Sequence, residues 1–210
     1  RLQYQTYDVS DLLRQGENVL GVVLGDGWYR GYLGWNGRRN TYGDRLALLA
    51  QLEITYADGR RQVITSDTNW KATTGPIRMS DIYMGEHYDA RLERTGWDKP
   101  GYDDHDWRGV RVLDHPKDIL VAPIGPPVRR IQEIRPVAIL YTPAGDTVVD
   151  MGQNMVGWVR LLVQGPAGTV ITLRHAEVLD KQGNLYTENL RSAKQTDQYI
   201  LKGVGEEVYE

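Results

Sequence analysis

The chain contains no cysteine and no phenylalanine among its 210 residues, and both absences narrow its chemistry. Without cysteine it forms no disulfide bond and has no thiolate to serve as a nucleophile or a metal ligand. The compartment stays open, because cysteine-free proteins occur inside and outside cells. With phenylalanine missing, 13 tyrosines and 6 tryptophans carry the aromatic surface. Such amphipathic rings suit sugar-binding surfaces, but they also fill a core in place of phenylalanine.

A basic excess and a long apolar run are also missing. The formal net charge is −3 and the isoelectric point is about 5.9. The chain therefore lacks the excess of basic residues that is typical of proteins that bind nucleic acid or an anionic membrane. No segment approaches the roughly 20 apolar residues of a membrane-spanning helix. Charged residues make up 25% and hydrophobic residues 40%, as in ordinary globular domains. The composition therefore predicts a globular protein with neither nucleic-acid nor membrane partners.

Signatures of common catalytic sites are missing as well. The sequence has no Gly-x-Ser-x-Gly motif, which would mark a serine nucleophile. Its four histidines never stand four residues apart, as zinc ligands on one helix face do. These are His87, His105, His115 and His175. We therefore predict no such nucleophile and no cofactor, with calcium as the one alternative considered below. Among the 28 acidic residues Glu177 and Glu188 could be nominated as a catalytic pair, but we favour their pairing with Arg174 or Arg191.

The chain begins at Arg1, inside a segment that already has the character of a strand. A natural terminus rarely opens within an element, so we expect a piece of a longer protein whose targeting segment is not included. The localisation is therefore unknown from the sequence.

The clearest strand covers residues 46–56. Its even positions are all apolar, whereas Gln51, Glu53 and Thr55 point to the other face. This period of two predicts a strand with one face on a core and the other largely in water.

Asp58-Gly59 follows that strand and is the pair that a type I′ turn prefers. A two-residue loop at this point predicts that residues 60–65 return as the partner strand. It would place Ile54 opposite Val63 and Tyr56 opposite Arg61.

Weaker patterns complete the first half of the chain. Residues 9–16 predict one helical turn, in which Asp8 or Ser10 caps the start and Gly16 takes a left-handed conformation at the end. Residues 18–24 form an apolar run that predicts a strand buried on both faces. Residues 70–72 and 82–83 predict further short strands. Because no apolar stripe of helical period exceeds about two turns, we predict an all-β protein.

Prolines mark a connector in the middle of the chain, at positions 116, 123, 126 and 127. Proline donates no ladder hydrogen bond and disfavours helix before it, so we place a domain boundary near residue 124. Strands are predicted beyond it, from residues 134–140, 158–163 and 170–173, with a turn at residues 165–168. Val159, Leu161 and Val163 should share one face and pack with Ile171 and Leu173. The prediction is two jelly-roll-like β-sandwiches in tandem, over residues 1–124 and 125–210.

Two series of sequence blocks resemble a known family. The first series runs through Tyr4-Gln-Thr-Tyr-Asp-Val9, Gly25-Asp-Gly-Trp-Tyr-Arg-Gly31 and Tyr88-Asp-Ala-Arg91. The second includes Asp150-Met-Gly-Gln-Asn154, Arg174-His-Ala-Glu177 and Thr196-Asp-Gln-Tyr199. In this order they resemble the bacterial α-L-rhamnosidases of glycoside hydrolase family 78. The first series is similar to their galactose-binding-like N-terminal module, and the second to the concanavalin-like β-sandwich that precedes their catalytic barrel.

The resemblance implies a division of labour. Both sandwiches would be truncated, the first at its start and the second at its end, and the catalytic carboxylates would belong to a barrel outside this sequence. The parent enzyme would remove terminal α-L-rhamnose from glycosides or polysaccharides with inversion of configuration. Its implied partners are the rhamnose-containing glycan and the barrel of the same polypeptide. The fragment itself is expected to be inactive.

One stretch combines rings with charges in the way that sugar recognition requires. Stacking rings offer an apolar face to a pyranose, and fixed charged groups offer partners to its hydroxyls. The candidate carbohydrate-binding residues are Asp26, Trp28, Tyr29, Arg30, Trp35, Asp44 and Arg45. In the structural alternative, which we favour, Trp28 plugs the sandwich core and Asp44 pairs with Arg45 or Arg30.

A dense group of oxygen ligands, Asp103, Asp104 and Asp106, suggests calcium binding. The spacing does not fit an EF-hand loop, so an acidic turn beside Trp107 is the alternative that we favour.

Three functions remain open at this point. The chain is the non-catalytic β-sandwich portion of an α-L-rhamnosidase, a free-standing carbohydrate-binding module, or a structural module that docks the barrel.

Overall fold

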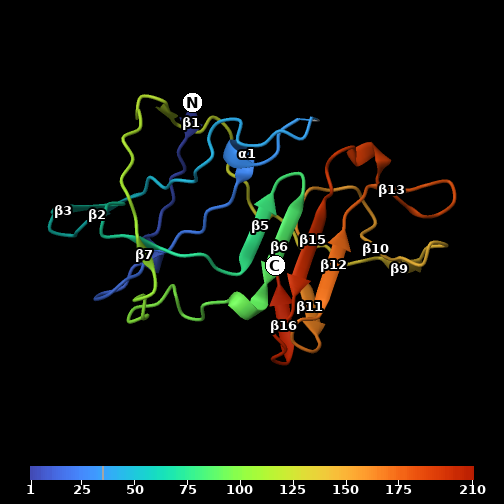
Figure 1. Ribbon diagram of the computed structural model, residues 1–210. Coiled ribbons are helices and arrows are strands. Elements are labelled where there is room, and N and C mark those ends of the chain that lie inside the picture. Colours follow the sequence, from blue (N-terminus) through green and yellow to red (C-terminus); the bar gives the residue numbers. More distant parts are fainter. Residues whose placement is uncertain (35) are drawn as a thin grey trace. The chain divides into compact units, whose positions relative to one another are not determined.

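The computed structural model describes residues 1–34 and 36–210 (Figure 1). Strands dominate these residues, so the all-β prediction is confirmed. The helical parts described are the short helix α1 and three single 3-10 turns, none of which is long or apolar enough to cross a membrane. Their bounds are α1 Gly27–Arg30, η1 Ser10–Leu12, η2 Ala90–Leu92 and η3 Glu188–Leu190.

The described chain divides into two compact units, and each takes several segments of the sequence. The first unit holds residues 1–22, 48–73 and 95–133. The second holds residues 23–47, 74–94 and 134–210. Both units therefore include segments from before the prolines, and the position of a boundary along the sequence near residue 124 stays a prediction.

The first unit contains three strand pairs. One is parallel, β1 with β8, and the other two are antiparallel, β2 with β3 and β4 with β7. The bounds are β1 Leu2–Gln3, β8 Leu120–Val121, β2 Gln51–Thr55, β3 Arg61–Thr65, β4 Lys71–Ala72 and β7 Arg108–Gly109.

The second unit is a β-sandwich. One layer is a four-stranded sheet in the order β12-β15-β6-β5, which lies side by side in Figure 1, and the pair β11-β16 lies across the core from it. The pairs β9-β10 and β13-β14 complete the unit. The four-stranded sheet consists of β5 Ile77–Asp81, β6 Gly85–Asp89, β12 Val170–Arg174 and β15 Thr196–Ile200. The pairs are β11 Leu161–Gln164 with β16 Glu206–Tyr209, β9 Ala138–Tyr141 with β10 Thr147–Asp150, and β13 Val178–Leu179 with β14 Leu185–Tyr186.

The core of this sandwich is built from tyrosines. Tyr199 and Leu201 are fully buried, and Tyr209 and Ala90 join them. Tyr88 stacks on Tyr199 with ring centroids 5.6 Å apart. Desolvation raises the pKa of all three phenols, which therefore stay neutral at physiological pH. Tyrosine thus replaces phenylalanine in the core, as one of the two readings of the composition predicted.

The predicted packing of the second sandwich is also confirmed. Val159, Leu161 and Val163 on one side and Ile171 and Leu173 on the other all pack against the tyrosine core. The turn at residues 165–168 is present as well, with the N–H of Thr169 donating to the carbonyl of Pro166.

A buried carboxylate ties the core to the turn between β15 and β16. Glu207 is 3% exposed and accepts hydrogen bonds from the Tyr199 hydroxyl and the N–H groups of Lys202 and Gly203, at 2.9, 3.0 and 2.7 Å. Burial raises the pKa of Glu207, but these hydrogen bonds outweigh burial and hold the pKa below its usual value. The group therefore stabilises the fold as an anion.

The hairpin of β2 and β3 exists, but its predicted register is wrong by one residue. Glu53 lies opposite Val63 and Ile54 opposite Gln62. Gly59 has φ +82, whereas Asp58 is not among the residues of positive φ, so the turn is not type I′. The N–H of Gly59 donates to the carbonyl of Tyr56 at 2.9 Å, which makes a three-residue loop with glycine in the left-handed position.

Other sequence expectations have mixed outcomes. The helical turn is present but shorter than predicted, at residues 10–12, and it is followed by Leu13 in an extended conformation. Asp8 accepts from the Ser10 N–H and Gly16 has a positive φ, but neither residue caps the turn as predicted. The buried strand at residues 18–24 is wrong: the structure assigns no strand there, and Val23 is 64% exposed. An apolar run makes a buried strand only where neighbours pair with it, and no described strand does. Residues 82–83 form the turn between β5 and β6 rather than a strand.

We expect Gly59→Val to lower the free energy of unfolding by about 1–2 kcal/mol, because a β-branched residue resists positive φ. Nothing lies within 4 Å of a Cβ added at Gly59, so the loss would come from backbone strain alone. Gly59→Asn is the matched control, since asparagine tolerates this conformation better. Equal stability of the Val variant and the wild type in urea unfolding would contradict the assigned turn.

We expect Glu207→Gln to lower the free energy of unfolding by about 1–3 kcal/mol at pH 7, because buried donors lose a charged acceptor. The folded pKa of Glu207 is lowered, so its stabilisation is present above the unfolded pKa and is lost as pH falls through the folded pKa. The difference between wild type and variant should therefore shrink in acid. Thermal melts across pH measure it, with the exposed neighbour Glu206→Gln as control; a difference that does not change with pH would count against the anionic role.

Candidate functional site

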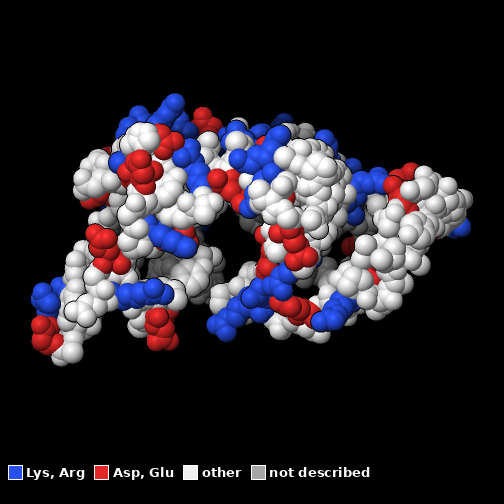
Figure 2. Space-filling view, turned by 90° about the horizontal axis from the view of Figure 1, so that it is seen from below, with Lys and Arg blue, Asp and Glu red and all other residues white. Residues whose placement is uncertain are grey.

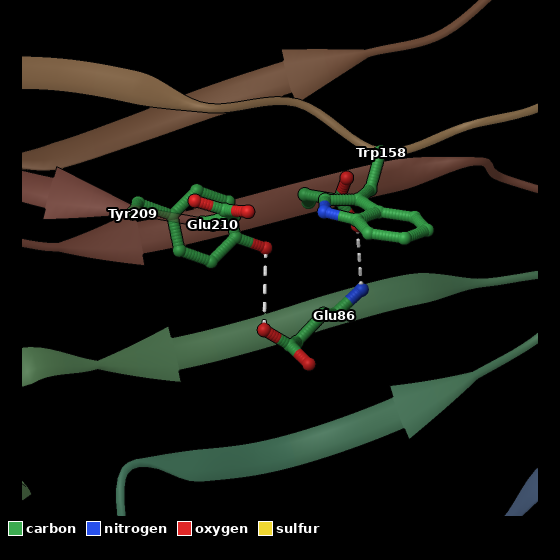
Figure 3. Close-up of a pocket in the computed structure, with 5 residues that line it drawn as sticks. Glu86, Trp158, Tyr209 and Glu210 are labelled. Atoms are coloured by element: carbon green, nitrogen blue, oxygen red, sulfur yellow. Dashed lines mark hydrogen bonds between the residues drawn. The ribbon is translucent and has the colours of Figure 1, made fainter. Parts of the chain in front are cut away.

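A pocket of about 340 Å³ opens in the second unit (Figure 3). Acidic and aromatic side chains line it: Glu86, Trp158, Asp197, Tyr209 and Glu210. Glu86 lies on β6, Asp197 on β15 and Tyr209 on β16. Trp158 precedes β11 and Glu210 follows β16. The pocket therefore lies where the two layers of the sandwich meet.

The parallel pairing of β6 and β15 brings two carboxyl groups into this pocket. His87 on β6 pairs with Gln198 on β15. The residue before each of them also meets its counterpart: the N–H of Glu86 donates to Oδ1 of Asp197 at 2.8 Å. His175 reaches Asp197 from the other side, with Nε2 2.8 Å from Oδ2. Because a carboxylate only accepts, this contact requires the proton on Nε2 of His175.

The surroundings shift the two acids in opposite directions. Desolvation raises the pKa of Glu86, which the Tyr209 hydroxyl opposes by donating to Oε1 at 3.2 Å. Burial also raises the pKa of Asp197, but the hydrogen bonds from His175 and the Glu86 N–H outweigh it and lower the pKa. Asp197 is thus the more acidic member of the pair.

Two aromatic side chains shape the remaining wall. Trp158 is 58% exposed and presents its ring to the pocket, as Figure 3 shows. Tyr209 is held in place, because it packs against Tyr199 with centroids 5.1 Å apart and donates to Glu86. An open ring face beside fixed acceptors can bind a polar ring-shaped ligand.

The predicted carbohydrate-binding residues lie elsewhere, around α1. Asp26 precedes this helix and pairs with Arg30 at 3.4 Å and with Arg39 at 2.7 Å. Trp28 is 59% exposed and meets the edge of Tyr83 with centroids 6.1 Å apart. The alternative in which Trp28 plugs the core is therefore wrong. Trp28 lies on the short helix α1, which the sequence pattern did not predict.

The other members of the predicted set are placed as follows. The Tyr29 ring lies against Gly43, where an added Cβ would collide with its hydroxyl. Asp44 pairs with Arg45 at 4.0 Å and both side chains are exposed, which is one of the two pairings predicted for Asp44. The other pairing is not formed, because Arg30 pairs with Asp26. Trp35 lies outside the described residues. The structure thus places Trp28 and Arg30 on α1 and pairs Arg30 with Asp26, which directly precedes this helix.

The calcium candidates lie in the first unit and have partners within the chain. Asp103 contacts His105 at 2.9 Å, and Asp104 pairs with Lys71 at 2.6 Å. The described residues contain no group of three or more His, Cys, Asp and Glu that could hold an ion. Calcium binding at these residues, including Asp106, stays a prediction.

Sequence reasoning missed the residues of the pocket. Glu86 and Asp197 stand in strands that no apolar alternation marks, and Trp158 was counted only as a strand residue. The available signal was the recurrence of acids beside tyrosines, in Glu86-His-Tyr-Asp89 and Asp197-Gln-Tyr199. Tyrosine combines an apolar ring with a hydroxyl that seeks a hydrogen-bond partner, and an acid on the same strand can supply that partner.

Charged side chains of both signs are interspersed over the face shown in Figure 2, and no large patch of one sign is visible on it. This agrees with the formal net charge of −3.

Two family models match the chain in succession. The α-L-rhamnosidase N-terminal domain matches residues 1–132, and the bacterial α-L-rhamnosidase concanavalin-like domain matches residues 141–210. Among curated proteins, an α-L-rhamnosidase of Streptomyces avermitilis is 51% identical over 100% of this chain and 20% of its own length. One from Formosa agariphila is 39% identical over 98% of the chain and 22% of its own length. The chain thus spans about a fifth of these relatives.

Solved structures give the same result. The native α-L-rhamnosidase of Aspergillus terreus superposes with a TM-score of 0.90 at 44% identity, over 100% of this chain and 24% of that one. The Streptomyces avermitilis α-L-rhamnosidase in complex with L-rhamnose superposes with a TM-score of 0.88 at 48% identity, over 99% of this chain and 20% of that one.

Proposed function

The chain belongs to the α-L-rhamnosidase family through its N-terminal and concanavalin-like domains, and we propose that it is the non-catalytic β-sandwich portion of a longer α-L-rhamnosidase. The observation that carries the proposal is that both domains follow one another in this chain as they do in the family. The whole chain is 51% identical to part of a relative about five times as long. In this proposal the longer protein hydrolyses terminal α-L-rhamnose from glycosides or polysaccharides. Its catalytic barrel lies in the same polypeptide and outside these 210 residues.

The arrangement of the pocket supports a non-catalytic role. A glycosidase places two carboxyl groups on either side of the bond that it cleaves. Here Glu86 and Asp197 lie side by side on adjacent strands, and the backbone of one donates to the carboxylate of the other. Glu86 and Asp197 therefore belong to one wall of the pocket and do not face each other across it.

A second candidate role is sugar binding at α1, favoured by the exposure of Trp28. Its ring is 59% exposed on the short helix where Arg30 pairs with Asp26, so a stacking face and charged groups occur in one segment. Docking of the barrel would use the same ring. The two roles differ in whether free sugar binds the isolated chain.

We expect the isolated chain to release no para-nitrophenol from para-nitrophenyl α-L-rhamnoside above the buffer rate. The catalytic carboxylates are placed in the absent barrel, so nothing in the chain should cleave the bond. A full-length relative serves as the positive control. Turnover that disappears in Glu86→Gln or Asp197→Asn would overturn the non-catalytic assignment.

We expect L-rhamnose to bind at Trp28 with a dissociation constant in the millimolar range, as about 4 kcal/mol from one stacked ring and a few hydrogen bonds implies. The indole N–H signal of Trp28, identified by its absence from the Trp28→Phe spectrum, should shift during an NMR titration. Trp28→Ala should change the free energy of unfolding by less than about 1 kcal/mol, because the ring is exposed.

A Trp28 signal that does not move up to high L-rhamnose concentration would favour docking over sugar binding. The family assignment would stand in either case, since it rests on the domain matches.

A further inference from the structure

Each acid of the pocket at Trp158 already has a hydrogen-bonding or ionic partner within the chain. Nε2 of His175 contacts Asp197 at 2.8 Å, and Nε of Arg160 contacts Glu210 at 2.7 Å. The remaining acid, Glu86, is half-buried, and desolvation raises its pKa. Three carboxyl groups line the pocket, and each accepts a hydrogen bond from a partner within the chain without a cationic ligand.

Two polar groups of the pocket residues have unused hydrogen-bonding capacity. Oε1 of Glu86 accepts from Tyr209, but Oε2 accepts from no described residue. The indole N–H of Trp158 likewise donates to no described residue. A ligand that both donates and accepts, as a hydroxyl does, would satisfy both groups.

Shape agrees with this chemistry. The volume of about 340 Å³ lies at the lower end of the range of small-molecule sites, roughly 300–1,000 Å³. Trp158 offers an open ring face, and Tyr209 is fixed by its packing and its hydrogen bond. One apolar wall and a rim of acceptors match a single pyranose, which has an apolar C–H face and hydroxyls at its edge.

We propose that the pocket formed by Trp158, Glu86, Asp197, Tyr209 and Glu210 binds one neutral sugar ring, at a site separate from the α1 surface. The ring stacks on Trp158, and its hydroxyls donate to Glu86 and accept from the indole N–H. The pocket is argued from geometry, whereas L-rhamnose as its ligand rests on the proposed function.

The same NMR titration tests both surfaces separately, because each tryptophan has its own indole signal. The Trp158 signal is identified by its absence from the Trp158→Phe spectrum. L-rhamnose and D-glucose are titrated in parallel with ethylguanidinium chloride. We expect a saturable shift of the Trp158 signal with L-rhamnose, and none with ethylguanidinium.

Variants separate binding from folding. Trp158→Ala should abolish the sugar-induced shifts of neighbouring pocket signals while leaving the rest of the spectrum unchanged, because the ring is exposed. Glu86→Gln keeps the size of the side chain and should weaken binding by about tenfold. Glu206→Gln, an exposed acid at the start of β16, is the matched control and should bind as the wild type does.

Each outcome decides the matter. A shift of the Trp158 signal with D-glucose but not L-rhamnose supports the pocket as a sugar site and counts against rhamnose as its ligand. A shift with ethylguanidinium alone overturns the proposal, because the pocket then receives a cationic side chain. A Trp158 signal that neither sugar moves also overturns it, whatever happens at Trp28.

Discussion

The parallel pairing of β6 with β15 is the interaction on which the second unit depends. It joins His87 to Gln198 and Tyr88 to Tyr199, segments more than a hundred residues apart in sequence. Without it, the hairpin of β5 and β6 would have no neighbour, and Tyr88 would lose the ring on which it stacks. Closing so long a loop costs conformational entropy, but this cost grows only slowly with loop length. The contacts of one well-packed strand pair can therefore offset it.

The same pairing determines where charge lies. It places Glu86 beside Asp197 at the mouth of the sandwich and Asp89 at its base, where Asp89 is 8% exposed. Burying a charge is costly unless partners satisfy it. Arg91 donates twice to Asp89 from its side chain, at 2.8 Å each, and His175 donates to Asp197. The acids of this sheet are therefore tolerated because each has a specific partner, and only Glu86 keeps an oxygen for something else.

The sequence predicted those parts of the fold that local pattern determines. Alternation located β2, and the apolar faces of β11 and β12 placed Leu161 and Ile171 against one core. The register of the first hairpin was wrong because Asp58-Gly59 fits two turn types that differ by one residue in loop length. Only the φ of Gly59 relative to that of Asp58 separates them.

The parts that could not be predicted depend on long-range contacts. β6 carries Glu86, whose partners Asp197 and Tyr209 come from the far end of the chain, so no local period reveals its role. The apolar run at residues 18–24 failed for the opposite reason, since its composition favours a strand but no described strand pairs with it. The candidate site shows the same limit: a sugar-like set was predicted at α1 from neighbouring residues, whereas the pocket is assembled from three distant strands and a loop.

The two tryptophans differ in their surroundings, and this difference bears on their roles. Trp28 contacts Tyr83 on one edge and has open solvent over most of its ring, so both a sugar and an apolar protein surface could cover it. Trp158 stands instead over a concave site with a free carboxylate oxygen and its own free N–H. An apolar partner would leave both polar groups without hydrogen bonds, at a cost of about 1–3 kcal/mol each. Polar groups of this kind discriminate against purely apolar contacts, so the Trp158 pocket is the more selective of the two surfaces.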